Sequence, residues 1–172
     1  GDFTIGAQAG FPSNAIHSPH NYQDNTVLVS LLTVPIRVAQ QNATVTFDEV
    51  VLVEPGEPGT VYGDPEFWDY VIVEGSRDGV HWLPLGDGYD CRSDPVWEAA
   101  WYDFTPGNGT MLRPHTFDLR QTFGWNETIL LRWRLWADGA VSGWGWAIDN
   151  LAIQTGAVGV PETPSASEVT LA

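Results

Sequence analysis

The sequence predicts one all-β domain, a β-sandwich built from two packed antiparallel sheets. Helical periodicity is almost absent, and short strand-like runs recur between Gly, Pro, Asn and Asp residues. The chain has 172 residues and is 43% hydrophobic, which is enough for one sizeable core but small for two. Many short strands at this spacing are typical of two facing sheets.

The runs that read as strands are 27–34, 43–53, 67–74, 81–85, 97–104, 111–119, 128–136 and 146–154. The second half of 43–53 is apolar on both faces, which predicts a central strand. In 128–136 the odd-numbered positions are apolar, and the even-numbered positions include Arg132, Arg134 and Trp136. Because side chains alternate along a strand, we expect the odd positions in the core and the even positions on the outer surface.

Two glycine-containing segments mark changes of chain direction. Asp78-Gly79 lies between two of the runs and predicts a hairpin. Gly143 and Gly145 flank a tryptophan just before the last run and predict a bend or bulge at its start. Asp149 is the only charged residue within that run, so its carboxylate is expected to be neutralised, hydrogen-bonded or bound to a metal.

The composition divides the chain at about residue 154. Residues 1–154 are expected to form the sandwich, and residues 155–172 form a Pro- and Ser-rich linker or an extended C-terminal tail. Three residues near the end of the tail have the character of a strand: Val169, Thr170 and Leu171. This segment is suited to adding a strand to an open sheet edge.

The charge balance restricts the partners. The chain has 22 acidic residues and seven basic ones, all arginine, for a net charge of −15. Nucleic acids and anionic membranes are therefore poor partners, whereas cations such as calcium suit the surface. No apolar run is long enough for a membrane helix, and the single cysteine excludes an internal disulfide.

Three motifs carry a family resemblance, namely FWDYVIVEGSRDG at 67–79, LLRWRL at 130–135 and GWAIDNL at 145–151. With Trp82, they resemble the secreted bacterial jelly-roll modules related to MAM domains and to the accessory domains of immune-inhibitor-A-type peptidases. The Pro- and Ser-rich tail resembles the junction before the sorting domain of type IX secretion substrates. The chain lacks the cysteine pairs of eukaryotic MAM domains, so their adhesion activity is not carried over.

The resemblance implies a jelly-roll fold of the MAM or concanavalin-like kind, without catalytic activity, in a secreted or cell-surface protein of bacteria. It also implies a structural calcium ion. Calcium takes six to eight oxygen ligands, many of them from carboxylates. We expect Asp149 to supply one, together with Asp48 or Glu49 and with Asp69, if their strands adjoin. In the alternative interpretation, Asp149 accepts backbone hydrogen bonds at a bulge and the other carboxylates face water.

The chain has nine tryptophans, more than one sandwich core holds. Tryptophans outside a core commonly serve in recognition, because the ring offers a flat apolar face and one donor. The candidate contact residues for a polysaccharide are Trp136, Arg132, Arg134, Trp101, Tyr102 and Trp125. The same residues could instead pack in the core or against another copy of the protein.

Catalytic and zinc motifs are missing from the sequence. It contains no Gly-x-Ser-x-Gly, His-Glu-x-x-His or phosphate-binding glycine loop. His17 and His20 are separated by a proline and have no third ligand nearby, so a loop or strand entry is expected there and not a zinc site.

The sequence therefore predicts a non-enzymatic protein with a structural or interaction role at a bacterial surface. One version is self-assembly into a filament or surface layer, in which the tail or residues 3–5 complete a neighbour's sheet. The partners would then be other copies of the chain or other surface proteins. The alternatives are a carbohydrate-binding module of a larger secreted enzyme and a calcium-dependent adhesin domain.

Overall fold

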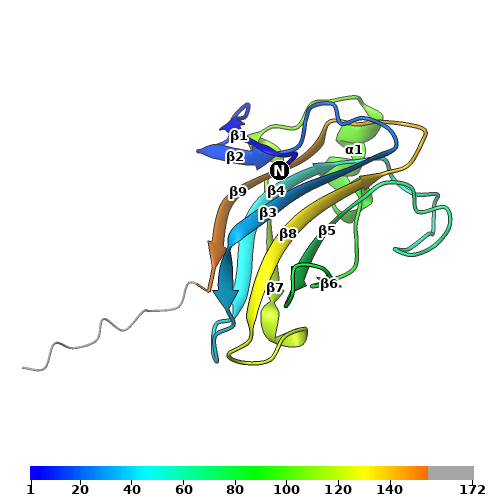
Figure 1. The fold of residues 1–172 in the computed structure, drawn as a ribbon. Helices are drawn as coiled ribbons and strands as arrows, with labels where there is room; N and C mark the ends of the chain where they lie inside the picture. Colours follow the sequence, from blue (N-terminus) through cyan, green and yellow to red (C-terminus); the bar gives the residue numbers. More distant parts are fainter. Residues whose placement is uncertain (155–172) are drawn as a thin grey trace, which may run out of the picture.

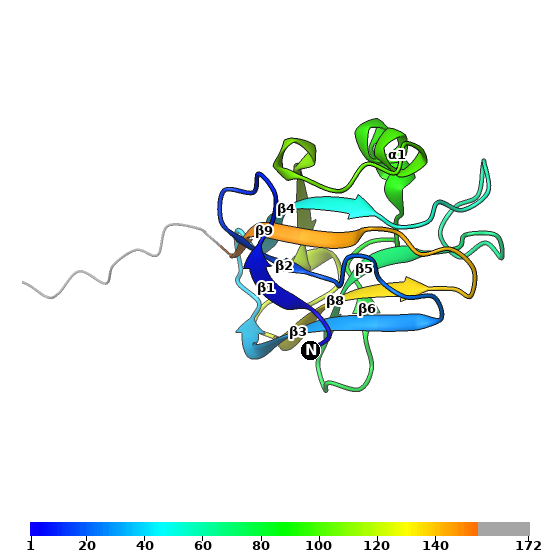
Figure 2. The same ribbon diagram turned by 90° about the horizontal axis from the view of Figure 1, so that it is seen from above.

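The computed structural model describes residues 1–154 and confirms an all-β sandwich of two antiparallel sheets. One sheet has five strands in the order β1-β2-β9-β4-β7, and the other has four in the order β3-β8-β5-β6. The two sheets form the two layers in Figures 1 and 2, and the short helix α1 lies at one end. Residues 155–172, including Val169, Thr170 and Leu171, lie outside the described residues.

The five-stranded sheet contains β1 (Thr4–Ala7), β2 (Asn14–His17), β9 (Gly145–Ile153), β4 (Thr44–Leu52) and β7 (Arg113–Asp118). The four-stranded sheet contains β3 (Thr26–Arg37), β8 (Thr128–Ala137), β5 (Tyr70–Ser76) and β6 (Leu83–Pro84). The helical turns are η1 (Cys91–Ser93), α1 (Pro95–Tyr102), η2 (Gly109–Met111) and η3 (Leu119–Gln121).

The predicted alternation in β8 is confirmed. Ile129, Leu131, Trp133 and Leu135 are buried, whereas the intervening side chains are partly exposed. Their indole and aliphatic groups pack against the facing sheet, where Phe47 of β4 makes an edge contact with Trp133. The central position predicted for 43–53 is also confirmed, because β4 lies between β9 and β7.

The entry into β9 has the bend that its glycines predict. Gly145 has a φ of +111°, a conformation that residues with a Cβ rarely adopt. Gly143 is required for a different reason, since a Cβ there would lie 2.5 Å from the carbonyl oxygen of Leu52. Further along, β9 and β4 change register between Thr46 and Asp48. The strand therefore enters the sheet at a position that only small residues permit.

The hairpin predicted at Asp78-Gly79 is confirmed, with a wider loop than a two-residue turn. β5 pairs with β6 through Gly75 and Leu83. Within the loop, the Oδ1 of Asp78 accepts the backbone N–H groups of Val80 and His81, both at 2.8 Å. The side chain thus holds the turn, as Asp side chains commonly do.

The prediction of a strand over 97–104 is wrong, because α1 occupies most of that run. Asp94 caps the helix by accepting the N–H of Val96 at 2.8 Å, and Pro95 starts it at a position where its missing N–H costs nothing. Trp97, Ala100 and Trp101 share one helical face toward the sandwich. The Asp-Pro start signal outweighs the β propensity of the aromatic residues in the run.

β1 and β2 are two further strands that the sequence did not predict. They pair with each other, with Ile5 opposite Ile16, and β2 pairs with β9. Residues 4–5 therefore already belong to their own sheet, in which β1 is an edge strand. At only four residues each, both strands are too short to show a clear alternation in sequence.

Candidate functional site

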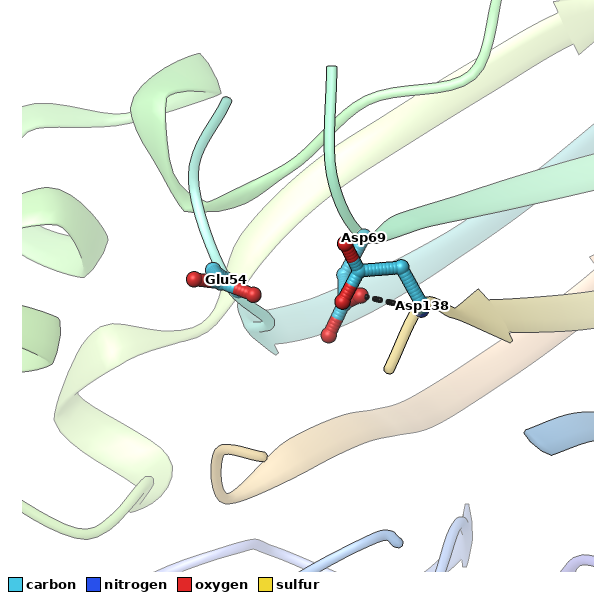
Figure 3. A group of neighbouring side chains, drawn as sticks. All are labelled: Glu54, Asp69 and Asp138. Atoms are coloured by element: carbon cyan, nitrogen blue, oxygen red, sulfur yellow. Dashed lines mark hydrogen bonds between the residues drawn. The ribbon is translucent and has the colours of Figure 1, made fainter. Parts of the chain in front are cut away.

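Three carboxylates meet where three strands end or begin. Glu54 follows β4, Asp69 precedes β5 and Asp138 follows β8. One ligand oxygen from each lies within 4.8 Å of the others, and Figure 3 shows the three side chains gathered together. Within residues 1–154, this is the one group of three or more His, Cys, Asp or Glu side chains that meets this criterion. We call it the acidic cluster.

Hydrogen bonds fix the most deeply buried member, Asp69. Its Oδ2 accepts the hydroxyl of Tyr22 at 2.5 Å, and its Oδ1 accepts the backbone N–H of Asp138 at 2.8 Å. The hydroxyl of Tyr22 in turn accepts the N–H of Glu54 at 3.1 Å. The three acids are therefore joined into one network, although they are far apart in sequence.

The acidic cluster holds negative charge without a basic partner. In the described part of the chain, no arginine or histidine forms an ion pair with these three carboxylates. Burial, and then the neighbouring charges of Asp69 and Asp138, raise the pKa of Glu54 from 4.5 to about 7. Burial also raises the pKa of Asp69, to about 6, against the opposing effect of its hydrogen bonds.

One carboxylate oxygen in the acidic cluster has no hydrogen-bond partner among residues 1–154. The Oε2 of Glu54 is buried, and no donor within residues 1–154 reaches it. A buried oxygen without a partner costs free energy, which a proton or a cation would recover. The donor set of hard carboxylate oxygens suits calcium and not a soft metal.

Glu54 also lines a pocket of about 460 Å³ beside α1. The aromatic residues of the pocket are Trp68, Trp101, Tyr102, Phe104 and Trp144, and its polar ones include Asn21, Glu57, Thr105 and Ser142. Two of the aromatic rings are open to solvent, with Phe104 93% exposed and Tyr102 62% exposed. Exposed aromatic side chains around a hollow are typical of a recognition site. We call this the aromatic pocket.

The local sequence explains how the aromatic pocket forms. The end of α1 presents Trp101 and Tyr102, and Phe104 follows with a φ of +53°, which is uncommon for a bulky residue. A Cβ on Gly143 would lie 2.1 Å from the ring of Trp101. Gly143 therefore makes room for the tryptophan of the pocket.

The four predicted calcium ligands do not form one site. Asp69 belongs to the acidic cluster. Asp48 and Asp149 are paired across β4 and β9, and the Nδ2 of Asn150 donates to Asp48 at 2.7 Å. Glu49, the next residue after Asp48, points to the opposite face of β4.

Asp149 is held mainly by hydrogen bonds from its surroundings. It is 3% exposed, and its Oδ1 accepts the hydroxyl of Ser13 and the N–H of Asn150, the latter at 2.7 Å. Its Oδ2 is buried and receives no hydrogen bond from the residues described here. The bond from Asn150 is the backbone contact of the alternative interpretation, but Glu49 and Asp69 are buried and do not face water as that interpretation expected.

The predicted contact residues fall in three places. Trp101 and Tyr102 line the aromatic pocket, and Trp125 is exposed in the loop before β8. Trp136, Arg132 and Arg134 lie on the outer face of the four-stranded sheet, as predicted. There, Trp136 stacks on Tyr70 with ring centroids 5.4 Å apart.

The arginines on that outer face are already engaged. Glu74 accepts the Nε of both Arg132 and Arg134 at 2.8 Å, and the guanidinium of Arg132 lies 4.1 Å from the ring of Trp82. Burial raises the pKa of Glu74, but the bonds from the two arginines outweigh it and hold the pKa below its usual value. The charged and aromatic side chains of this face thus bind one another. Both pockets described in this structure lie elsewhere.

Sequence reasoning missed Glu54 and Asp138. Each follows directly after an apolar strand and precedes a Pro or Gly turn, in LVEPG and LWADG. Acids at strand ends were a usable signal, but the sequence does not show which strand ends meet. For the histidines, a loop or a strand entry was predicted; His17 is instead the last residue of β2, and its ring stacks on that of His20 in the loop that follows.

Within residues 1–154, no helix has the length and apolar character needed to cross a membrane. No protein-family model matches the chain, and no curated protein matches it either.

Proposed function

We propose that the chain is a non-catalytic recognition module of a secreted or bacterial cell-surface protein, and that its aromatic pocket binds a saccharide. The observation that carries the proposal is the hollow of about 460 Å³ with five aromatic side chains and Glu54 in its wall. Sugar rings present apolar C–H faces and hydroxyl edges. Aromatic rings match the former, and carboxylate and amide groups match the latter.

The exposed rings favour recognition over packing within the chain. Burying a fully exposed Phe or Tyr against a ligand is worth about 1.5–3 kcal/mol by the apolar area removed from water. Phe104 could contribute this binding free energy, since 93% of its surface is exposed in the free protein. Its backbone conformation is also unfavourable for a bulky residue, so a role in binding explains why an aromatic ring is kept there.

Calcium fits the acidic cluster as a structural ion. Glu54, Asp69 and Asp138 would hold it, and the unpartnered Oε2 of Glu54 supports this assignment. The ion would offset two of the three negative charges and link the end of β4, the start of β5 and the end of β8. Because Glu54 belongs to both sites, calcium would also fix one wall of the aromatic pocket.

The test is binding to a glycan array, followed by calorimetric titration of the best ligand. Trp101→Ala is expected to abolish or strongly weaken binding. Trp125→Ala is the matched control, because it removes an exposed tryptophan outside the pocket. Trp136→Ala tests the outer face of the four-stranded sheet, and we expect it to leave binding unchanged.

Two outcomes would count against the proposal. Loss of binding in Trp136→Ala but not in Trp101→Ala would move the site to the sheet face. Absence of any glycan ligand, with and without calcium, would leave the aromatic pocket without this function.

A second candidate is self-assembly through the edge of β1. The other three edge strands each contain a proline, namely Pro35 in β3, Pro84 in β6 and Pro114 in β7, which blocks strand addition. In addition, Asp2 occupies the N–H and the carbonyl of Val29 on β3. β1 has no proline, and its Ile5 is 74% exposed.

The occupant of the β1 edge would be the tail of another copy, through Val169, Thr170 and Leu171. Deleting residues 160–172 should then leave a folded monomer. Light scattering that detects the same assemblies before and after the deletion would exclude the tail as the connecting strand. The kinship with MAM-like jelly-roll modules stays a prediction from the motifs.

A further inference from the structure

A second cleft of about 460 Å³ opens beside β7 and shares no lining residue with the aromatic pocket. Its walls include Glu49, Tyr89, Asp94, Arg113 and His115. It therefore needs an explanation of its own, independent of the proposed saccharide site.

Glu49 is a carboxylate in the core of the sandwich, 1% exposed. Its neighbours on the same face of β4 are the buried Phe47 and Val51. The Oε2 of Glu49 accepts the indole N–H of Trp146 at 2.7 Å and the hydroxyl of Tyr89 at 2.8 Å. An apolar residue would fill this position at lower cost, so packing alone does not explain the carboxylate.

The third partner of Glu49 is His115, which reaches the solvent. The Nδ1 of His115 lies 2.5 Å from the Oε1 of Glu49, and its ring stacks on Phe117 at 4.4 Å between centroids. The side chain of Glu49 is 2% exposed and that of His115 31%. With Nδ1 turned toward the core, Nε2 stays available, and no residue of 1–154 bonds to it. A buried carboxylate that orients a histidine in this way leaves the second nitrogen for a ligand.

Arg113 stands two residues before His115, on the same face of β7. Its Nε donates to the Oδ2 of Asp94 at 2.7 Å, and its Nη1 donates to the carbonyl of Leu112 at 3.0 Å. Its Nη2 makes no hydrogen bond with the described residues. The guanidinium is therefore held in place while part of its fork stays free.

We propose that this cleft binds a small carboxylate, held between the guanidinium of Arg113 and the Nε2 of His115. Arg113 is a charged donor held by Asp94, and His115 is oriented by Glu49. Charge-assisted bonds from a guanidinium to a carboxylate are among the strongest hydrogen bonds in proteins. The net charge of −15 repels polyanions, which favours a small anion as the ligand.

The test is an NMR titration of the histidine ring nitrogens in the ¹⁵N-labelled chain. Sodium acetate and sodium glucuronate are added against sodium chloride at equal ionic strength, and glucose serves as the sugar without a carboxylate. We expect a saturable shift of the His115 nitrogens with both carboxylates and none with glucose or chloride. Tighter binding of glucuronate than of acetate would identify a sugar acid as the source of the carboxylate.

Arg113→Gln is expected to weaken carboxylate binding roughly tenfold or more, because a charge-assisted bond is lost. Arg120→Gln is the matched control, since Arg120 donates to the carbonyl of Gln40 outside the cleft. Unchanged affinity in Arg113→Gln, or no saturable shift in the wild-type chain, would overturn the proposal.

A second measurement needs no variant. Diethyl pyrocarbonate modifies accessible imidazole nitrogens, and mass spectrometry reports the rate at His115. Glucuronate should slow this reaction while leaving the rate at the exposed His81 unchanged. Equal rates at His115 with and without glucuronate would contradict binding at this cleft.

Discussion

The indole N–H of Trp146 donates to the buried carboxylate of Glu49 across the paired strands β9 and β4, at 2.7 Å. Both residues are at most 1% exposed. The Gly-Trp-Gly-Trp segment at the start of β9 thus supplies a donor to the acid that orients His115. β9, the middle strand of the five-stranded sheet, therefore fixes a carboxylate that lines the second cleft.

Trp146→Phe should lower the free energy of unfolding by more than Trp133→Phe does. Both changes remove the same part of a buried indole, but the Nε1 of Trp133 has no hydrogen-bond partner among the described residues. Loss of the bond to Glu49 is expected to add about 1–3 kcal/mol. Urea denaturation measures the difference, and equal losses would mean that the bond contributes nothing.

Glu54→Gln should change how stability depends on pH. The folded-state pKa of Glu54 is raised to about 7, so the bound proton stabilises the fold fully below pH 4.5. That stabilisation is lost as the pH rises through about 7. In EDTA, the melting temperature of the wild-type chain should therefore fall relative to that of Glu54→Gln across this window.

The same pair of proteins tests the calcium assignment. At pH 8, calcium should raise the melting temperature of the wild-type chain and raise that of Glu54→Gln much less. Glu66→Gln is the control, because it removes an exposed carboxylate outside the acidic cluster. An equal response of all three proteins to calcium would place the ion elsewhere.

Gly143→Ala should disturb the aromatic pocket and the fold together. The new Cβ would lie 2.1 Å from the Trp101 ring and 2.5 Å from the carbonyl oxygen of Leu52. Overpacking of this kind typically costs about 1–3 kcal/mol. Gly6→Ala, whose Cβ would make an ordinary 3.4 Å contact with His17, is the control. Tryptophan fluorescence and thermal melts report both effects, and similar results for the two variants would contradict the close approach.

Asp94→Ala should destabilise α1 by about 1 kcal/mol through loss of its N-cap. It also removes the partner of Arg113, whose Nε lies 2.7 Å from Asp94. Asp94→Asn keeps an N-cap acceptor and loses the charge, so it separates the two effects. In urea denaturation, the free energy of unfolding should decrease from wild type to Asp94→Asn and then to Asp94→Ala. Equal stability of the two variants would show that the N-cap hydrogen bond does not stabilise α1.

The α1 segment shows where local sequence signals compete. The aromatic residues of 97–104 favour a strand, and the run alone predicts one. The chain forms a helix because Asp94 and Pro95 satisfy or remove the first backbone donors, and because Trp97, Ala100 and Trp101 then bury one face. The Asp-Pro start signal was present in the sequence, but the helix is favoured over a strand only because its apolar face packs against the sandwich.

The sequence by itself determined the sandwich, its central strand, the alternation of β8 and the bend at Gly145, since these follow from side-chain period and backbone freedom within a few residues. Only the tertiary structure decided which acids meet. Asp69 joins Glu54 and Asp138, and Glu49 joins His115, because strand order brings distant chain ends and faces together. Contacts of that kind depend on the pairing of both sheets, which no local pattern in the sequence encodes.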